Sequence, residues 1–305
     1  MTRLATWETI GTNVRDCLDI DSVLKESNLD YTVETENMQT ASGIVIPDKY
    51  ATVANYNDGS KEYKGIVGNG YSICQNIDAF NFIDTLKPNG LEYVKAGETA
   101  AGMVYIISKL PSFEVFGDEI VPYVIFQNSH NGRFALQATI CALRIVCNNQ
   151  FASTFGSFNN NIKIYHTNSL QSKLATSSAV LQSVGMYMQD FKKDAEMLYN
   201  KKLSVEEVNK IFDTYFEIAK QNDMSSRQAN RLIANRQKIE IAYNADDNQN
   251  FKGTVWGVVN AFTDFNTHRE VKNTPTAADS KFITTTFDNR ELEKFMKIAT
   301  SMSAA

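Results

Sequence analysis

The sequence has few of the residues that build metal sites, disulfides and thiol active sites. Its 305 residues include four cysteines and three histidines, and no two cysteines form a CxxC pair. A zinc site needs Cys or His ligands at short spacings, whereas the histidines lie far apart in the sequence. Cys141 and Cys147 lie in an apolar run, which favours buried free thiols. We therefore expect no metal and no cofactor, and we assign no catalytic residue.

Long apolar runs are also missing. The first 20 residues mix Arg3, Glu8 and Asp16 with apolar residues, which is unlike a signal peptide. No apolar run approaches the roughly 20 residues that span a bilayer. Free thiols fit a reducing compartment, so we expect a cytoplasmic protein with no membrane partner.

The chain lacks an overall excess of basic charge. Its net charge is −5, and the balance is uneven: residues 1–219 hold 25 acidic and 18 basic side chains, whereas residues 220–305 hold 10 and 12. Any contact with phosphate groups therefore requires a local basic patch. The 13 tyrosines and 18 phenylalanines are numerous enough to fill a core and leave some rings for a surface.

Hydrophobic periodicity predicts a β-rich first part. Apolar residues at helical spacing predict a helix over Trp7–Glu26, and a second helix is expected over Asn76–Leu86. Strand-like runs fill most of Tyr31–Phe155, and their short connections favour an antiparallel or mixed sheet.

From Ser169 onward the pattern is mainly helical. A long helix is predicted over Lys173–Leu203, and the capping box Ser204-Val205-Glu206-Glu207 predicts the start of another. Further helices are expected over three segments: Ser225 or Ser226 to Ala242, Gly253–Phe265 and Asn289–Met302. A loop is expected over Asn266–Lys281. We predict an α+β protein with a β-rich domain (1–168) and a helical region (169–305) that pack as one unit.

Two polar features interrupt the apolar strands. Asn128–Arg133 is a Gly-centred polar turn, and Arg144 lies in the apolar run Leu143–Val146, where a buried Arg is costly unless it is paired. The turn is either a ligand site or an ordinary hairpin turn. Arg144 meets either an anionic ligand or an internal acidic or carbonyl partner. The residues predicted to form this polar core or ligand cluster are Asn128, His130, Arg144, Asn148 and His166.

A basic helix provides a second candidate site. Arg227, Arg231 and Lys238 recur at i, i+4 and i+11 and share one helix face, with Arg236 beside it. Such a face can follow a phosphate backbone, although a solvated amphipathic helix has the same pattern. Phe155 and Tyr165 lie in a Ser/Asn-rich stretch, where they either stack on bases or pack between the two halves.

Three blocks of sequence resemble a known family. The first runs from Gly65-Ile66-Val67 through Tyr71 to Ala79-Phe80. The second joins Asn128–Gly132 to Arg144–Asn149 and His166-Thr167. The third is Gly253–Thr263, ending near His268. With these three blocks, the chain resembles the phage- and plasmid-like proteins of the domain-of-unknown-function family 932 (DUF932). The resemblance extends from about Trp7 to Ala299. Where that family usually has Asp, Ser and Thr, this chain has Asn131, Arg133 and Gln150.

The resemblance implies a mobile element in a host cell but no settled biochemistry. Together with the basic helix and the aromatic residues, it leads us to expect a nucleic-acid-binding protein of a phage or plasmid. Its partner would be single- or double-stranded DNA, and its role would be as an oligomeric single-strand annealing factor or as a replication or recombination accessory factor. The alternative is a non-enzymatic factor that binds a host or phage protein or assembles with itself. A hydrolase or nuclease is disfavoured, because no carboxylate cluster stands out by spacing.

Overall fold

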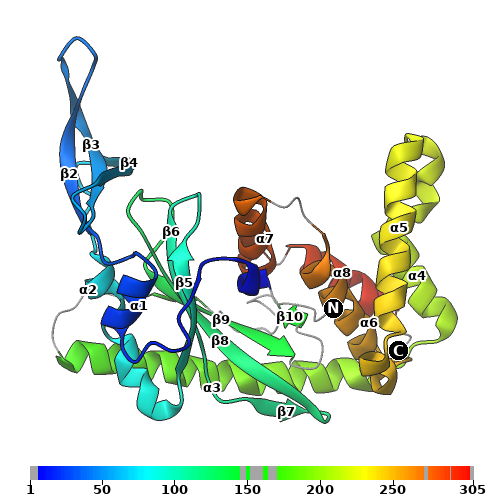
Figure 1. Ribbon diagram of the computed structural model, residues 1–305. Coiled ribbons are helices and arrows are strands. Elements are labelled where there is room, and N and C mark those ends of the chain that lie inside the picture. The colour runs from blue at the N-terminus through cyan, green and yellow to red at the C-terminus, as the bar shows by residue number, and fades with distance from the viewer. Residues whose placement is uncertain are drawn as a thin grey trace.

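The computed structural model describes residues 6–144, 149–151, 161–163, 170–270, 274–288 and 290–302. Antiparallel sheets make up the first part of the chain and helices dominate the second, as the sequence predicts (Figure 1). Among the described strands every pairing is antiparallel, so the sheet is antiparallel rather than mixed.

The main sheet has eight strands. Six follow one another in the order β1 (Thr12–Asn13), β5 (Glu92–Glu98), β6 (Met103–Lys109), β8 (Asp118–Ser129), β9 (Gln137–Arg144) and β10 (Asn149–Phe151). In addition, β7 (Phe113–Val115) pairs with β8, and β11 (Asn161–Lys163) pairs with β9. Nearly every residue of β8 is buried, because both faces of the sheet are covered.

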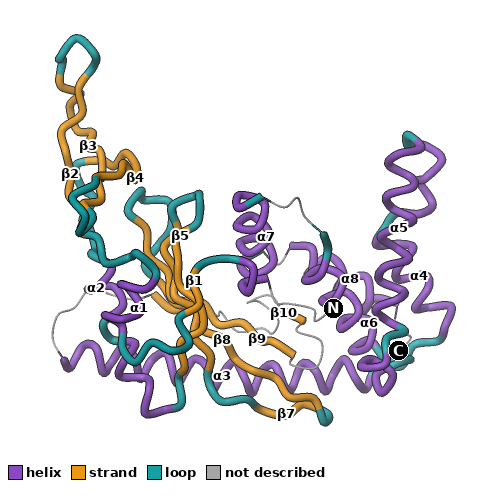
Figure 2. The backbone as a smooth tube through the Cα atoms, viewed as in Figure 1, coloured by secondary structure: helices purple, strands orange, loops and turns teal. Residues whose placement is uncertain are grey.

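One face of the sheet packs on the long helix α3 (Leu170–Asn200), which runs along the molecule in Figures 1 and 2. Val180, Tyr187 and Phe191 of α3 share a core with the sheet residues Ile106 and Phe126. That core also holds side chains from the later helices, so the β-rich and helical parts are buried against each other. The opposite face is covered by the 3₁₀ helix η1 (Thr6–Thr9) and by α7 (Pro275–Phe287), which contribute Trp7 and Phe282 to a second core.

A smaller sheet forms an arm that projects from the body (Figure 1). Its order is β2 (Thr32–Gln39), β3 (Val45–Asn55) and β4 (Lys61–Gly68). The base of β3 is buried, whereas Ile44 and Val45 at the tip are 66% and 58% exposed. The strand β4 pairs with β3 only from Lys49 onward, so the tip is a two-stranded ribbon. The helices α1 (Ile20–Glu26) and α2 (Asn76–Phe80) lie near its base, and η2 (Ile83–Asn89) contacts α3.

The helical part begins with α3. After α3 come α4 (Val205–Tyr215), η3 (Ile218–Asp223), α5 (Ser226–Tyr243), η4 (Asp246–Phe251), α6 (Val255–His268), α7 and α8 (Arg290–Met302). The predicted caps are confirmed: the Ser204 and Ser225 hydroxyls accept hydrogen bonds from the backbone N–H groups of Glu207 and Gln228. None of the described helices is both long and apolar enough to cross a membrane.

Two predicted segments are wrong. The helix expected over Trp7–Glu26 is divided into η1, β1 and α1, because Gly11 adopts φ +60° and lies against the Ala96 carbonyl group of β5. The loop expected over Asn266–Lys281 contains the start of α7 instead. Thr274 caps that helix through the Ala277 N–H, and Pro275 occupies its first turn, where a missing N–H costs nothing.

Candidate functional site

Arg144 is buried in an ion-pair cluster that joins the sheet to the helical part. Its Nε and Nη2 atoms donate to both carboxylate oxygens of Asp118, at 2.6 and 3.0 Å, and Nη1 lies 3.3 Å from Oδ2 of Asp247. Nη2 also donates to the Asp247 carbonyl oxygen at 2.5 Å, and the guanidinium lies over the Phe251 ring. Of the two alternatives left open by the sequence, the structure therefore contains an internal acidic pairing.

The structure does not bring Arg144 to the polar turn. Arg144 pairs in register with Ile120, whereas Gln137 pairs with Gln127 near the other end of the same hairpin. Seven residues at about 3.3 Å each separate the two ends by roughly 23 Å. Asn148 and His166, the other members of the predicted polar cluster, lie outside the described residues.

Asn128 and His130 do come together, and a residue that the sequence did not single out joins them. Oδ1 of Asn76 accepts from Asn128 Nδ2 at 3.2 Å and lies 2.9 Å from His130 Nε2, so the imidazole carries its proton on Nε2. Asn76 Nδ2 in turn donates to the Leu29 carbonyl oxygen. Burial, together with the charge of Lys64, lowers the pKa of His130 to about 4. His130 is therefore neutral at pH 7. Its contact with Asn76 of α2 also joins the polar turn of the main sheet to the base of the arm.

Asn131, the next residue of the turn, packs tightly between two glycines. Its side chain donates from Nδ2 to the Ala101 carbonyl oxygen at 2.9 Å, and its Oδ1 accepts from the backbone N–H of Arg133 at 3.0 Å. Added methyl groups at Gly65 of β4 or at Gly102 would collide with the Asn131 side chain. An Asp at this position would place a carboxylate against the Ala101 carbonyl oxygen, so the amide suits this turn.

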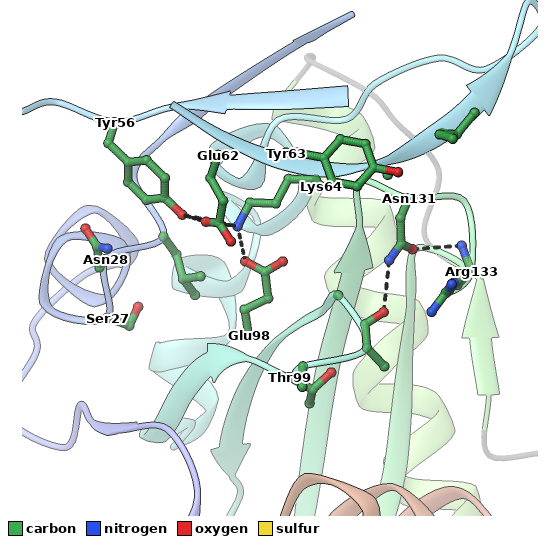
Figure 3. Close-up of a pocket in the computed structure, with 16 residues that line it drawn as sticks. Ser27, Asn28, Tyr56, Glu62, Tyr63, Lys64, Glu98, Thr99, Asn131 and Arg133 are labelled. Atoms are coloured by element: carbon green, nitrogen blue, oxygen red, sulfur yellow. Dashed lines mark hydrogen bonds and ion pairs between the residues drawn. The ribbon is translucent and has the colours of Figure 1, made fainter. Parts of the chain in front are cut away.

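The polar turn forms one wall of a cleft of about 700 Å³. The arm lies above the cleft, and the loop 98–102 between β5 and β6 lies below it (Figure 3). Tyr63, Lys64, Glu98, Asn131 and Arg133 all line it. Arg133 is exposed, and its guanidinium has no hydrogen-bond or ion-pair partner in the part of the chain that the structure describes. Polar and charged side chains therefore line this cleft from both the arm and the polar turn.

Lys64 holds the other wall in place. Its ammonium group donates to Glu62 and Glu98, each at 2.8 Å, and to the Tyr56 hydroxyl at 3.1 Å. It also lies 4.6 Å from the ring centre of Tyr31, whose hydroxyl donates to Oε2 of Glu98 at 3.0 Å. Burial alone would lower the pKa of Lys64, but the hydrogen bonds to Glu62 and Glu98 outweigh it and raise the pKa. We call these five residues the Lys64 cluster.

The predicted basic helix is α5, which stands out from the body in Figure 1. Arg227, Arg231 and Lys238 are exposed, and none has a side-chain ion pair with another described residue. We call these three the basic face. Only Ile239 and Ala242 of α5 are buried, and both lie near its C-terminal end.

Arg236 has a different environment from the basic face. Its Nε donates to Asp213 at 2.9 Å, Nη2 donates to Asn209 at 2.7 Å, and Nη1 pairs with Glu240. The guanidinium also lies over the Phe212 ring of α4. Arg236 therefore ties α5 to α4. Phe155 and Tyr165, the predicted stacking residues, lie outside the described residues.

Sequence reasoning missed Lys64 and Glu98. They lie 34 positions apart and are brought together only because β4 crosses above the end of β5. Among the described residues no group of three or more His, Cys, Asp or Glu side chains is arranged to hold a metal ion.

A family model described as a domain of unknown function (DUF932) matches residues 64–296, about three quarters of the chain. The chain therefore belongs to this family, and the match includes β4 from Lys64 onward, the polar turn, Arg144 and α5. No curated protein and no solved structure matches the chain.

Proposed function

We propose that this member of the DUF932 family binds nucleic acid through the basic face of α5, as a single-strand annealing, replication or recombination accessory factor of a phage or plasmid. The observation that carries the proposal is the exposure of Arg227, Arg231 and Lys238 on one side of a projecting helix. These side chains have no acidic partner among the described residues, so their charges are available to phosphates. The excess of acidic residues elsewhere would direct a polyanion to this helix.

The geometry of the basic face suits contacts to a backbone rather than to bases. Arg227 and Lys238 are 11 positions apart, or about 16 Å along a helix. Contacts to phosphates position a strand without reading its sequence. Binding should therefore be independent of sequence. It should also weaken as the salt concentration rises, because the release of counterions from the nucleic acid becomes less favourable, and log K should fall against log[salt] with a slope of about 0.7 to 0.9 per phosphate neutralised.

Fluorescence anisotropy with labelled single- and double-stranded oligonucleotides at several salt concentrations tests the proposal. The triple variant Arg227→Gln/Arg231→Gln/Lys238→Gln should bind at least about tenfold more weakly at low salt, and the salt slope should fall by about two to three. The matched control, Lys192→Gln/Lys193→Gln/Lys297→Gln, removes the same charge from exposed positions on α3 and α8. Absence of binding at tens of micromolar, binding without salt dependence, or an equal loss in the control would overturn the proposal.

The arm favours a second candidate function, which is binding to a host or phage protein or to another copy of this chain. Ile44 and Val45 expose apolar surface at the tip of a ribbon that the described chain leaves uncovered. A two-stranded ribbon is only marginally stable alone in water, so a partner that covers it gains apolar contact. A stoichiometric partner that survives nuclease treatment, or a concentration-dependent oligomer in light scattering, supports this candidate if Ile44→Ser/Val45→Ser abolishes it.

A further inference from the structure

The cleft beneath the arm has two chemically different ends. On one wall Arg133 presents a guanidinium with no side-chain partner in the described chain. A guanidinium offers paired N–H donors that match the oxygens of a phosphate or carboxylate. The turn that carries Arg133 is held in place by hydrogen bonds, because the Asn131 side chain donates to the Ala101 carbonyl oxygen and accepts from the backbone N–H of Arg133. The Arg133 end of the cleft therefore suits an anionic group.

The opposite wall offers an acceptor. Oε2 of Glu98 accepts from Lys64 and from the Tyr31 hydroxyl, whereas Oε1 accepts no hydrogen bond from any described residue. Figure 3 shows the Glu98 carboxylate on the side of the cleft away from Arg133. Because the Lys64 cluster holds this carboxylate in position, its free oxygen can accept from an amino or hydroxyl group of a ligand without reorganising.

An aromatic ring lies between the two ends. Tyr63 projects from β4 over the cleft, and 59% of the residue is exposed (Figure 3). Exposed rings of this kind stack on the planar faces of bases. The volume of about 700 Å³ lies within the range of roughly 300–1,000 Å³ that is usual for small-ligand sites.

These three groups discriminate between ligand classes. A free α-amino acid carries its ammonium and carboxylate groups on one carbon, whereas Glu98 and Arg133 lie on opposite walls of the cleft. A nucleotide carries its phosphate and the amino group of its base at opposite ends of the molecule, with the flat base between. Carboxylates accept hydrogen bonds from the exocyclic amino group of cytosine.

We propose that this cleft binds a nucleoside 5′-phosphate, with the phosphate on Arg133, the base on Tyr63 and the base amino group on Glu98. The ligand is either a free nucleotide or the end residue of a strand, since both carry these groups. The site is separate from the basic face of α5, and the proposal does not depend on the one made for that helix.

Isothermal titration calorimetry of the full chain with cytidine 5′-monophosphate tests the proposal. We expect saturable binding of one nucleotide per chain, at least about tenfold weaker in Arg133→Gln and in Tyr63→Ala. Both side chains are exposed, so both variants should fold. The control Arg290→Gln changes an 84% exposed arginine side chain outside the cleft and should bind as the unmodified chain does. The proposal is overturned by no binding at millimolar nucleotide or by equal losses in Arg290→Gln.

A comparison of two nucleotides tests the proposed hydrogen bond between the base amino group and Glu98. Uridine 5′-monophosphate has no exocyclic amino group and should bind at least about fivefold more weakly than the cytidine nucleotide. Equal binding of the two would overturn the assignment of Glu98. An oligonucleotide with a 5′-phosphate that displaces the cytidine nucleotide identifies a strand end as the ligand, and failure to displace it identifies a free nucleotide.

The proposals for the cleft and for α5 can be disproved independently of each other. Loss of cytidine nucleotide binding in Arg133→Gln, with an unchanged salt slope for oligonucleotides, separates the cleft from α5. Binding of the mononucleotide without any binding of oligonucleotides would retain the cleft and overturn the proposal for α5.

Discussion

Arg144 and Asp118 form a bidentate ion pair inside the protein, with N–O distances of 2.6 and 3.0 Å. The side chain of Arg144 is 1% exposed and that of Asp118 is 11% exposed. A pair so far from water is costly to form but far more costly to break, because removing one partner leaves the other charge uncompensated.

The variant Arg144→Ala should therefore be strongly destabilised. We expect the free energy of unfolding to fall by about 3–5 kcal/mol, because both Asp118 and Asp247 lose their cation. Urea unfolding followed by circular dichroism measures this change. Arg290→Ala, which breaks an exposed pair with Asp288, should change the free energy of unfolding far less, because solvent screens this pair. Similar losses in the two variants would contradict the importance of burial.

His130 should make stability depend on pH. Its pKa is lowered to about 4, from an ordinary value of 6.5. Above pH 6.5 the imidazole is neutral in both states, and no stability is lost. Between pH 6.5 and 4 only the unfolded chain binds the proton. The free energy of unfolding therefore falls as the pH is lowered, by about 3 kcal/mol in total for this group.

Unfolding measured from pH 7 to pH 4 in the unmodified chain and in His130→Gln isolates this contribution. Carboxylates titrate in both proteins, so the difference between the two curves reports the histidine. A difference that does not change with pH would show that His130 titrates normally in the folded protein.

The contact between the arm and the polar turn should tolerate no added methyl group. Gly65→Ala places a Cβ against the side chain of Asn131, and overpacking of this kind costs about 1–3 kcal/mol. Gly68→Ala, on the same strand, has open space around the new methyl group and should be close to neutral. Thermal unfolding compares the two, and equal midpoints would show that the arm shifts freely.

The Lys64 cluster should depend on its ammonium group. Lys64→Met leaves Glu62 and Glu98 without their shared cation, and we expect a loss of about 2–4 kcal/mol. Lys61→Met provides the matched control on the same strand, because Lys61 is exposed and its ion pairs within the described part of the chain are with exposed Glu34 and Glu36. Lys61→Met should lower the free energy of unfolding much less than Lys64→Met, because solvent screens its ion pairs. Urea unfolding of both variants checks this, and a smaller loss for Lys64→Met would contradict it.

Local signals in the sequence predicted the helix starts well. Ser204 and Ser225 each satisfy N–H groups three residues ahead, and this chemistry is visible in four consecutive letters. Gly11 shows the limit of such signals. Periodicity predicted a helix through it, but a close approach to Ala96 of another strand determined its backbone, and the partner is 85 positions away.

The candidate site was harder to predict than the fold. The cost of a buried arginine predicted that Arg144 has a partner, but Asp118 and Asp247 are 26 and 103 positions away, and spacing cannot identify them. The turn at Asn131 was visible, but the cleft beside it needs β4 and β5 to cross. Tertiary contacts of this kind have no periodic signal in the chain.

The cluster around Arg144 also sets an order of events during synthesis. The main strands up to β9 have all been made once residue 144 leaves the ribosome, yet Asp247 follows 103 positions later. At about 5–20 residues per second, that interval lasts on the order of 5–20 seconds. Throughout it the newly made sheet has neither its second carboxylate nor the Phe251 ring. During this interval the part of the sheet around Arg144 therefore lacks the contacts that the later helices supply.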